Sequence, residues 1–175
     1  MTAGPEEHVD LEAATHAALV RSLGGQRRHV LGIVEGLSDE QLRATMLPSG
    51  WSCLGLIQHL TRDVEHYWFS VVMGDEPLDE ASSDRDDATE SWQVEHDVRA
   101  DSVLAAYRAA IEAADRVIGA TPLDAPPKKR DPWWGEWSVP DLRFVLLHVI
   151  AEIACHAGHL DAARELIDGT QWLTL

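Results

Sequence analysis

The sequence has little positive charge. It holds 14 Lys and Arg residues against 30 Asp and Glu residues, which gives a formal net charge of −16. A surface this acidic repels the phosphates of nucleic acids and the headgroups of anionic lipids. The longest basic run, residues 128–130, is too short to reverse that effect. We therefore expect neither nucleic acid nor a membrane as a partner.

Cysteine and long apolar runs are also scarce. The two cysteines, Cys53 and Cys155, are far apart and fit no metal or redox spacing. We expect both to be small buried hydrophobic residues in a reducing compartment. No apolar run reaches the roughly 18 residues of a membrane span, and the polar, acidic start MTAGPEEHVD is unlike a signal peptide. We therefore expect a soluble cytoplasmic protein.

Strand patterns are nearly absent, and helical periodicity takes their place. The chain of 175 residues fits one domain, residues 1–175. The Gly24-Gly25 pair is expected to interrupt the first helix. Amphipathic helices are predicted over about residues 11–35, 52–73, 98–120 and 141–168. Because residues 74–97 and 121–140 form long connections, we predict an all-α four-helix bundle with long connections between its helices.

Local signals mark the ends of these helices. Ser38 followed by Gln41 is typical of a capping box and predicts a short helical turn. Ser52 is the expected N-cap of the second long helix. Pro140 suits the first turn of the last helix, and Gly169 is expected to end it.

The stretch HVIAEIACHAGHL, residues 148–160, places three histidines and a glutamate among apolar residues. Each helical residue advances about 100°, which puts the apolar stripe on Leu142, Val145, Val149, Ile153, Leu160, Ala163 and Ile167. His156 falls inside that stripe and Glu152 on its margin, whereas His148 and His159 flank it. Burying a carboxylate costs several kcal/mol unless it is paired or bound to a metal. Glu152 and His156 are therefore candidate metal ligands at i,i+4 spacing.

A third ligand has to come from another helix. The apolar stripe of CLGLIQHLTRDVEHYWF consists of Cys53, Leu56, Leu60, Val64, Tyr67 and Val71. His59 lies on its flank, with Asp63 one turn further and His66 near the same edge. Asp63 would orient His59 by a hydrogen bond or be solvated. Two histidines and one carboxylate leave coordination positions open, as catalytic sites do. The alternative is that Glu152 and His156 pair only with each other, in a structural role.

The acidic connection and the tryptophans of the last connection each have two interpretations, and four histidines have no assigned role. The acidic connection 74–97 is either a solvated surface or a lid over a site. Three aromatic residues of the last connection either pack in the fold or line a pocket mouth, namely Trp133, Trp134 and Trp137. Four histidines carry no spacing signal and are expected at the surface, namely His8, His16, His29 and His96.

The segments PSGWSCLGLIQHLTRDVEHYWF and DLRFVLLHVIAEIACHAGHLDAARELIDG resemble the DinB/YfiT-like superfamily of metal-binding four-helix bundles. The branch they resemble contains the N-terminal domain of mycothiol-dependent maleylpyruvate isomerase and the mycothiol S-transferases. The likeness covers about residues 17–169. It implies that His59, Glu152 and His156 hold the metal. Many members have histidine at the first fourth-helix position, so Glu152 favours this branch. His159 falls where other members often carry glutamine.

The resemblance also implies a chemistry. A low-molecular-weight thiol, mycothiol or a similar one, would bind the metal through sulfur, and the resulting thiolate would attack an electrophilic small molecule. Zn²⁺ is the first expectation, and Ni²⁺, Fe²⁺ or Mn²⁺ would fit the same ligands. Iron-dependent oxygenation is an enzymatic rival. The isomerase's additional domain has no counterpart here, so we do not expect the isomerisation itself.

Two further expectations follow from the resemblance. Many DinB-like proteins have no known reaction, so the alternative function is non-enzymatic binding of a metal or ligand in a stress response. Related bundles often pair, so we expect a homodimer.

Overall fold

Helices make up the regular secondary structure of residues 10–77 and 92–172, which are the parts of the chain that the computed structural model describes. In chain order the elements are α1 (Leu11–Ile33), α2 (Asp39–Arg43), α3 (Cys53–His59), the π-helix η1 (Leu60–Met73), α4 (Ala100–Ala120), the 3₁₀ turn η5 (Pro132–Trp134) and α5 (Leu142–Asp168). No strand occurs among these residues, so the predicted all-α fold is confirmed.

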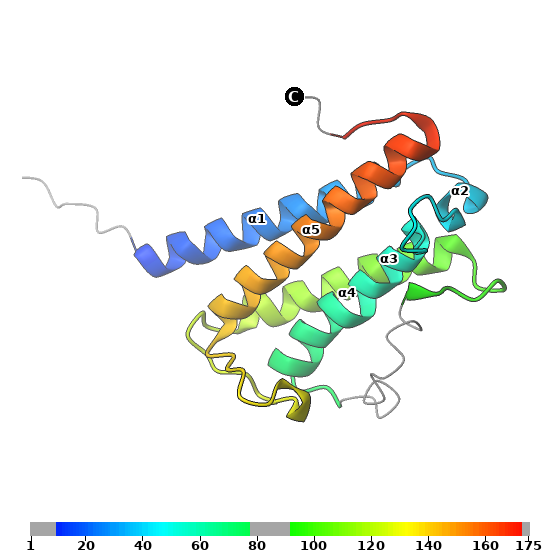
Figure 1. Ribbon diagram of the computed structural model, residues 1–175. Helices are drawn as coiled ribbons and strands as arrows, with labels where there is room; N and C mark the ends of the chain where they lie inside the picture. The colour runs from blue at the N-terminus through cyan, green and yellow to red at the C-terminus, as the bar shows by residue number, and fades with distance from the viewer. Residues whose placement is uncertain (1–9, 78–91, 173–175) are drawn as a thin grey trace, which may run out of the picture.

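The long helices α1, α4 and α5 and a second rod in chain order form the bundle, whose arrangement Figure 1 shows. The second rod is α3 continued by η1. The helix α1 packs along α5, and α4 packs along η1, while α5 also contacts α3 and η1. This agrees with the predicted DinB-like bundle with long connections. The contact between α5 and the α3–η1 rod is the one that positions the candidate ligands.

The helix α1 runs without a break through Gly24 and Gly25, so the predicted interruption is wrong. Each glycine costs a helix interior roughly 1 kcal/mol relative to alanine. Leu23, Val30 and Ile33 are buried in the core. Burial of each such side chain contributes about 1.5–3 kcal/mol, so packing outweighs the intrinsic preference of the two glycines.

The α3–η1 rod confirms the helix predicted over residues 52–73, but its winding changes along its length. The 7 residues of α3 are α-helical, and the 14 residues of η1 have the wider π-helical winding. Segments of π-helix are rare and often occur at functional sites. No residue pattern in the sequence predicts this change. His59, the last residue of α3, lies at the junction.

This rod is buried on more than its predicted face. All of the predicted stripe is buried, namely Cys53, Leu56, Leu60, Val64, Tyr67 and Val71. Leu54, Ile57 and Phe69 lie off that stripe and are fully buried as well. The reason is that three other helices, α2, α4 and α5, all contact the rod. The rod is therefore the central element of the bundle.

Most helix ends are as predicted. The Ser38 side chain accepts from the Gln41 backbone N–H and the Gln41 side chain accepts from the Ser38 N–H, which completes the capping box of α2. Ser52 caps α3, and Gly169 ends α5 at a φ of 78°. Pro140 is not in the first turn of α5, so that prediction is wrong. Asp141 is the N-cap instead, because its carboxylate accepts the Phe144 backbone N–H.

The apolar stripe predicted for the last helix is confirmed. Val145, Val149, Ile153 and Leu160 have no exposed surface. Within the described residues, α5 is the one helix with the length and composition of a membrane span. The sequence led us to expect no apolar run of that length, and 39% of the apolar window of α5 is buried inside the bundle.

The two cysteines differ in their surroundings. Cys53 is buried, and burial raises the pKa of its thiol to about 11. Cys155 is exposed on α5, so the prediction that both cysteines are buried is wrong for this one. The physical reason is position, because Cys155 lies off the apolar stripe of α5.

A buried ion pair joins α1 to η1. The Arg27 guanidinium donates to both Glu65 carboxylate oxygens, at 2.7 and 2.6 Å. It also donates to Asp115 of α4 at 2.7 Å. Glu65 has no exposed surface and Arg27 is 5% exposed. One buried guanidinium thus ties three helices together, with Asp115 at the exposed end of the cluster.

Candidate metal centre

Three potential ligands meet between α3 and α5. His59 comes from the end of α3, and Glu152 and His156 come from successive turns of α5. Each residue offers one ligand atom, and these atoms lie within 4.8 Å of one another. The side chains of His59 and His156 are 13% and 11% exposed, whereas that of Glu152 is 40% exposed. The three predicted ligands are therefore brought together, with the carboxylate on the open side.

The ring of His59 is oriented by Asp63. Its Nδ1 lies 2.8 Å from Asp63 Oδ2. A carboxylate only accepts, so Nδ1 carries a proton, and Nε2 is the nitrogen that can offer a lone pair in the neutral imidazole. That Nε2 atom is buried and has no hydrogen-bond partner. A buried nitrogen in this state costs free energy, and a cation among the three residues would satisfy it. The donor set therefore fits a divalent metal ion.

His156 is held in its neutral form. Burial lowers the pKa of His156, and the nearby His59 ring lowers it further, against the opposing effect of Glu152. Neutral imidazole is the form that binds metals. The Nε2 atom of His156 lies 3.4 Å from Glu152 Oε1, so the alternative pairing of these two residues does occur. The pairing of Glu152 with His156 still leaves the Nε2 atom of His59 without a partner. This favours an ion bound by all three residues.

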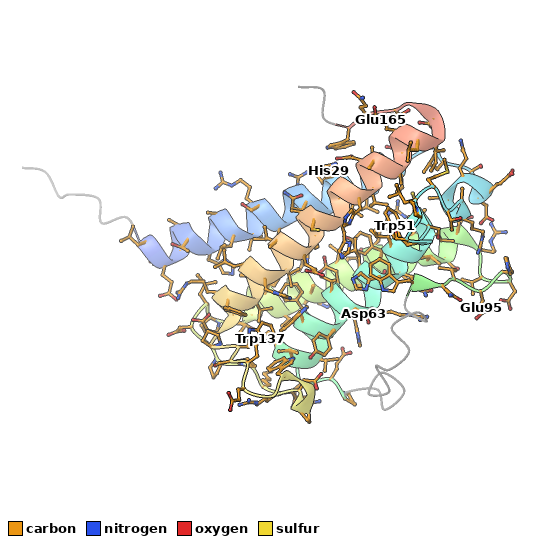
Figure 2. All side chains as sticks on the ribbon, in the orientation of Figure 1. His29, Trp51, Asp63, Glu95, Trp137 and Glu165 are labelled. Atoms are coloured by element: carbon orange, nitrogen blue, oxygen red, sulfur yellow. The ribbon has the colours of Figure 1, made fainter. Side chains whose placement is uncertain are left out.

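The neighbouring histidines lie outside this group. His159 is exposed on α5, with its ring 5.6 Å from that of His156 and 5.8 Å from that of Trp51. His148 is half-buried, and burial lowers its pKa. Its ring lies 4.7 Å from that of Trp68. His66 is exposed and lies 3.0 Å from Glu76. Figure 2 labels Asp63 on the α3–η1 rod and Trp51, which lies just before the start of α3.

One aromatic residue at this site has no counterpart in the predictions. The ring of Trp92 stacks on that of His59, with centroids 4.1 Å apart and planes at 14°. The same indole lies 5.5 Å from the His156 ring. Trp92 lies within the acidic connection 74–97, for which a lid over a site was one interpretation, and no periodicity there relates it to a helix. Residues 78–91 of that connection lie outside the described residues. Its position depends on how that segment docks, which local patterns do not show.

The aromatic residues of the last connection mostly pack. Trp134 is buried and its indole N–H donates to the Tyr67 hydroxyl at 2.9 Å. That hydroxyl donates in turn to Asp131 at 2.8 Å. Trp137 is 41% exposed and contacts His148 at 5.8 Å between centroids. The packing interpretation is therefore confirmed for Trp134. The placement of the Trp133 side chain lies outside the described residues.

The histidines expected at the surface do not all lie there. His96 is exposed and His16 is half-buried, while His8 lies outside the described residues. His29 is 12% exposed in its side chain, so its surface assignment is wrong. It lies 2.8 Å from Asp161 and stacks on Trp172 at 5.3 Å. The close packing of α1 on α5 covers it.

One surface hollow lies away from the candidate metal centre. It measures about 360 Å³ and lies between α2 and the start of α4, where Leu42, Arg43, Val98 and Arg99 line it. None of the three candidate ligands lines this hollow. The chemistry of the donor atoms, rather than the size of a cavity, marks the site.

Fold and site together define the class of protein: a DinB-like helical bundle with two imidazoles and one carboxylate gathered between two of its rods. A family model described as mycothiol-S-transferase matches residues 18–169. The chain belongs to the mycothiol-S-transferase family. The resemblance that the sequence motifs showed is confirmed. No curated protein gives a sequence match to the chain.

Proposed function

We propose that this protein is a metal-dependent transferase that conjugates mycothiol, or a closely similar thiol, to an electrophilic small molecule. The observation that carries the proposal is the buried, unpartnered Nε2 of His59 beside Glu152 and His156, in a chain of the mycothiol-S-transferase family. His59, Glu152 and His156 would hold the ion. Zn²⁺ is our first choice, and Ni²⁺, Fe²⁺ and Mn²⁺ suit the same donors.

The bound ion would supply the chemistry of a Lewis acid, because coordination keeps a thiol in its nucleophilic thiolate form at neutral pH. The reaction balances simply. The thiol loses its proton to solvent, a sulfur–carbon bond forms, and the leaving group departs with the electron pair of the bond that breaks. With an epoxide or activated alkene, the electrophile keeps all its atoms and gains the proton.

The residues of the chain set up this reaction by position and charge. Asp63 keeps the proton on Nδ1 of His59, so Nε2 stays available for the ion. The lowered pKa of His156 keeps the second imidazole neutral. The single carboxylate of Glu152 leaves the ligand set with one negative charge, so a divalent ion there retains net positive charge and attracts a thiolate. The exposure of Glu152 supports an approach of the thiol from its side of the site.

The proposal is tested with the metal-loaded protein, mycothiol and a chromogenic aryl chloride. We expect the conjugate to form with the native chain and to fall to the uncatalysed rate in Glu152→Ala and His59→Ala. His66→Ala is the matched control, because His66 lies on the same rod but is exposed and paired with Glu76. Retained metal with no conjugate from any thiol would instead favour a non-enzymatic metal-binding protein. A homodimer and a cytoplasmic location stay predictions.

A further inference from the structure

The indole of Trp92 contacts two of the three candidate ligands from outside the bundle's long helices. It stacks on His59 at 4.1 Å and lies 5.5 Å from His156. Its segment, residues 92–98, leads into α4, and we call it the strap. Figure 2 shows Glu95 of the strap to one side of the α3–η1 rod. The strap is thus a third element at a site otherwise built from two.

Side chains of α3 hold the first residues of the strap. The Gln58 side-chain amide donates to the Gln93 backbone carbonyl at 2.8 Å. Gly55 lets the backbone of Trp92 lie close against α3, because a Cβ at this position would be 2.0 Å from the Trp92 carbonyl oxygen. Glycine in a helix interior costs roughly 1 kcal/mol relative to alanine. Its presence in α3 is explained by the docking of Trp92.

The rest of the strap is held by α2. The Arg43 guanidinium donates to the carbonyl oxygens of Val94 and Glu95, at 3.4 and 3.3 Å, and also to that of Val98. The strap therefore has anchors along its whole length. These contacts fix Trp92 against His59 in addition to the packing of its partly buried side chain on the core.

We infer that Trp92 is a positioning residue of the metal centre, which fixes the plane of the His59 ring and favours its metal-bound form. Asp63 selects the nitrogen that faces the site, and the indole face restricts rotation of the ring. An imidazole bound to a divalent ion is electron-poor, and an indole face attracts positive charge. The inference rests on the metal site of the proposed function but not on its thiol chemistry.

The test uses Co²⁺ alone, which reports binding by its visible absorption and quenches nearby tryptophan emission. Trp92→Ala should weaken Co²⁺ binding about tenfold, whereas Trp92→Phe should stay within about threefold because a phenyl face remains. Trp92→Phe should nevertheless lose most of the Co²⁺-dependent quenching. Trp172→Ala is the matched control, because that indole stacks on His29, away from the ligands. It should change neither readout.

A second route displaces the strap without touching the indole. Gly55→Ala should weaken Co²⁺ binding as Trp92→Ala does, since its Cβ meets the Trp92 backbone. Gly158→Ala is its control on α5, because a Cβ there meets nothing within 4 Å. A Co²⁺ affinity that is near native in Trp92→Phe but weakened in Trp92→Ala would support a positioning role over a merely structural one.

Three results decide between the claims. Wild-type affinity in Trp92→Ala, or unchanged quenching in Trp92→Phe, would overturn the role of Trp92 and leave the transferase proposal intact. The expected Co²⁺ results without any thiol conjugation would support Trp92 and remove only the transferase proposal. A native chain that binds no Co²⁺ would overturn both.

Discussion

Asp63 lies one helical turn beyond His59, with its Oδ2 atom 2.8 Å from Nδ1 of that imidazole. The pair spans the junction between α3 and η1. This contact turns Nε2, which is buried and has no hydrogen-bond partner, toward Glu152 and His156. The hydrogen bond therefore decides which nitrogen of His59 is available to an ion.

Removing this contact should weaken metal binding without removing a ligand. We expect Asp63→Ala to lower metal affinity about 10–100-fold, the usual effect of losing the hydrogen-bond partner of a metal-binding histidine. Asp63→Asn should lie between the native chain and Asp63→Ala, because an amide oxygen still accepts from Nδ1. Competition against a chelator of known affinity measures the change.

The control for this prediction is Glu76→Gln. Glu76 lies 3.0 Å from His66, which is exposed and outside the ligand group. The Glu76→Gln substitution should therefore leave the metal affinity unchanged. Equal affinities in Asp63→Ala and the native chain would show that Asp63 does not orient His59.

The buried Arg27–Glu65 pair makes a prediction about stability. Burial raises the pKa of Glu65, and the hydrogen bonds from Arg27 oppose that shift. Arg27→Met would leave the carboxylate buried without its partner, at a cost of about 3–5 kcal/mol in the free energy of unfolding. The double variant Arg27→Met with Glu65→Met should recover much of that loss, because no buried charge remains. Urea denaturation measures the free energy of unfolding of both variants. An equal loss of that free energy in the single and the double variant would contradict this account.

The two cysteines should differ in reactivity. The thiol of Cys53 is buried and its pKa is raised to about 11, so it is almost wholly protonated at pH 8. Cys155 is exposed. We expect a thiol-specific chromogenic reagent to react quickly with Cys155 alone in the folded protein, and with both cysteines in denaturant. Cys155→Ser should abolish the fast reaction, and a fast reaction that persists in this variant would place Cys53 at the surface.

Much of the candidate site was predictable from local spacing. Glu152 and His156 stand out because one lies on the margin of an apolar stripe and the other inside it, and His59 because it flanks the stripe of another helix. Trp92 was not predictable, because its contact depends on a docked segment that has no periodicity. The metal-binding role of the three residues stays a prediction.

In the fold, too, local sequence patterns predicted some features, and the packing of helices on one another set the others. Helix extents follow from periodicity and caps, as Ser38 and Ser52 show. The continuity of α1 through Gly24 and Gly25 depends on packing that overrides local preference. The burial of Arg27 and His29 likewise depends on which helices meet, and no residue spacing in one helix reports that.

The central claim is that His59, Glu152 and His156 hold one divalent ion. Elemental analysis of purified protein, after reconstitution with Zn²⁺ and removal of free metal, tests it most directly. We predict about one equivalent of metal in the native chain, the same amount in His66→Ala, and a small fraction of it in His59→Ala. Equal metal content in His59→Ala and the native chain, or no metal in either, would contradict the account.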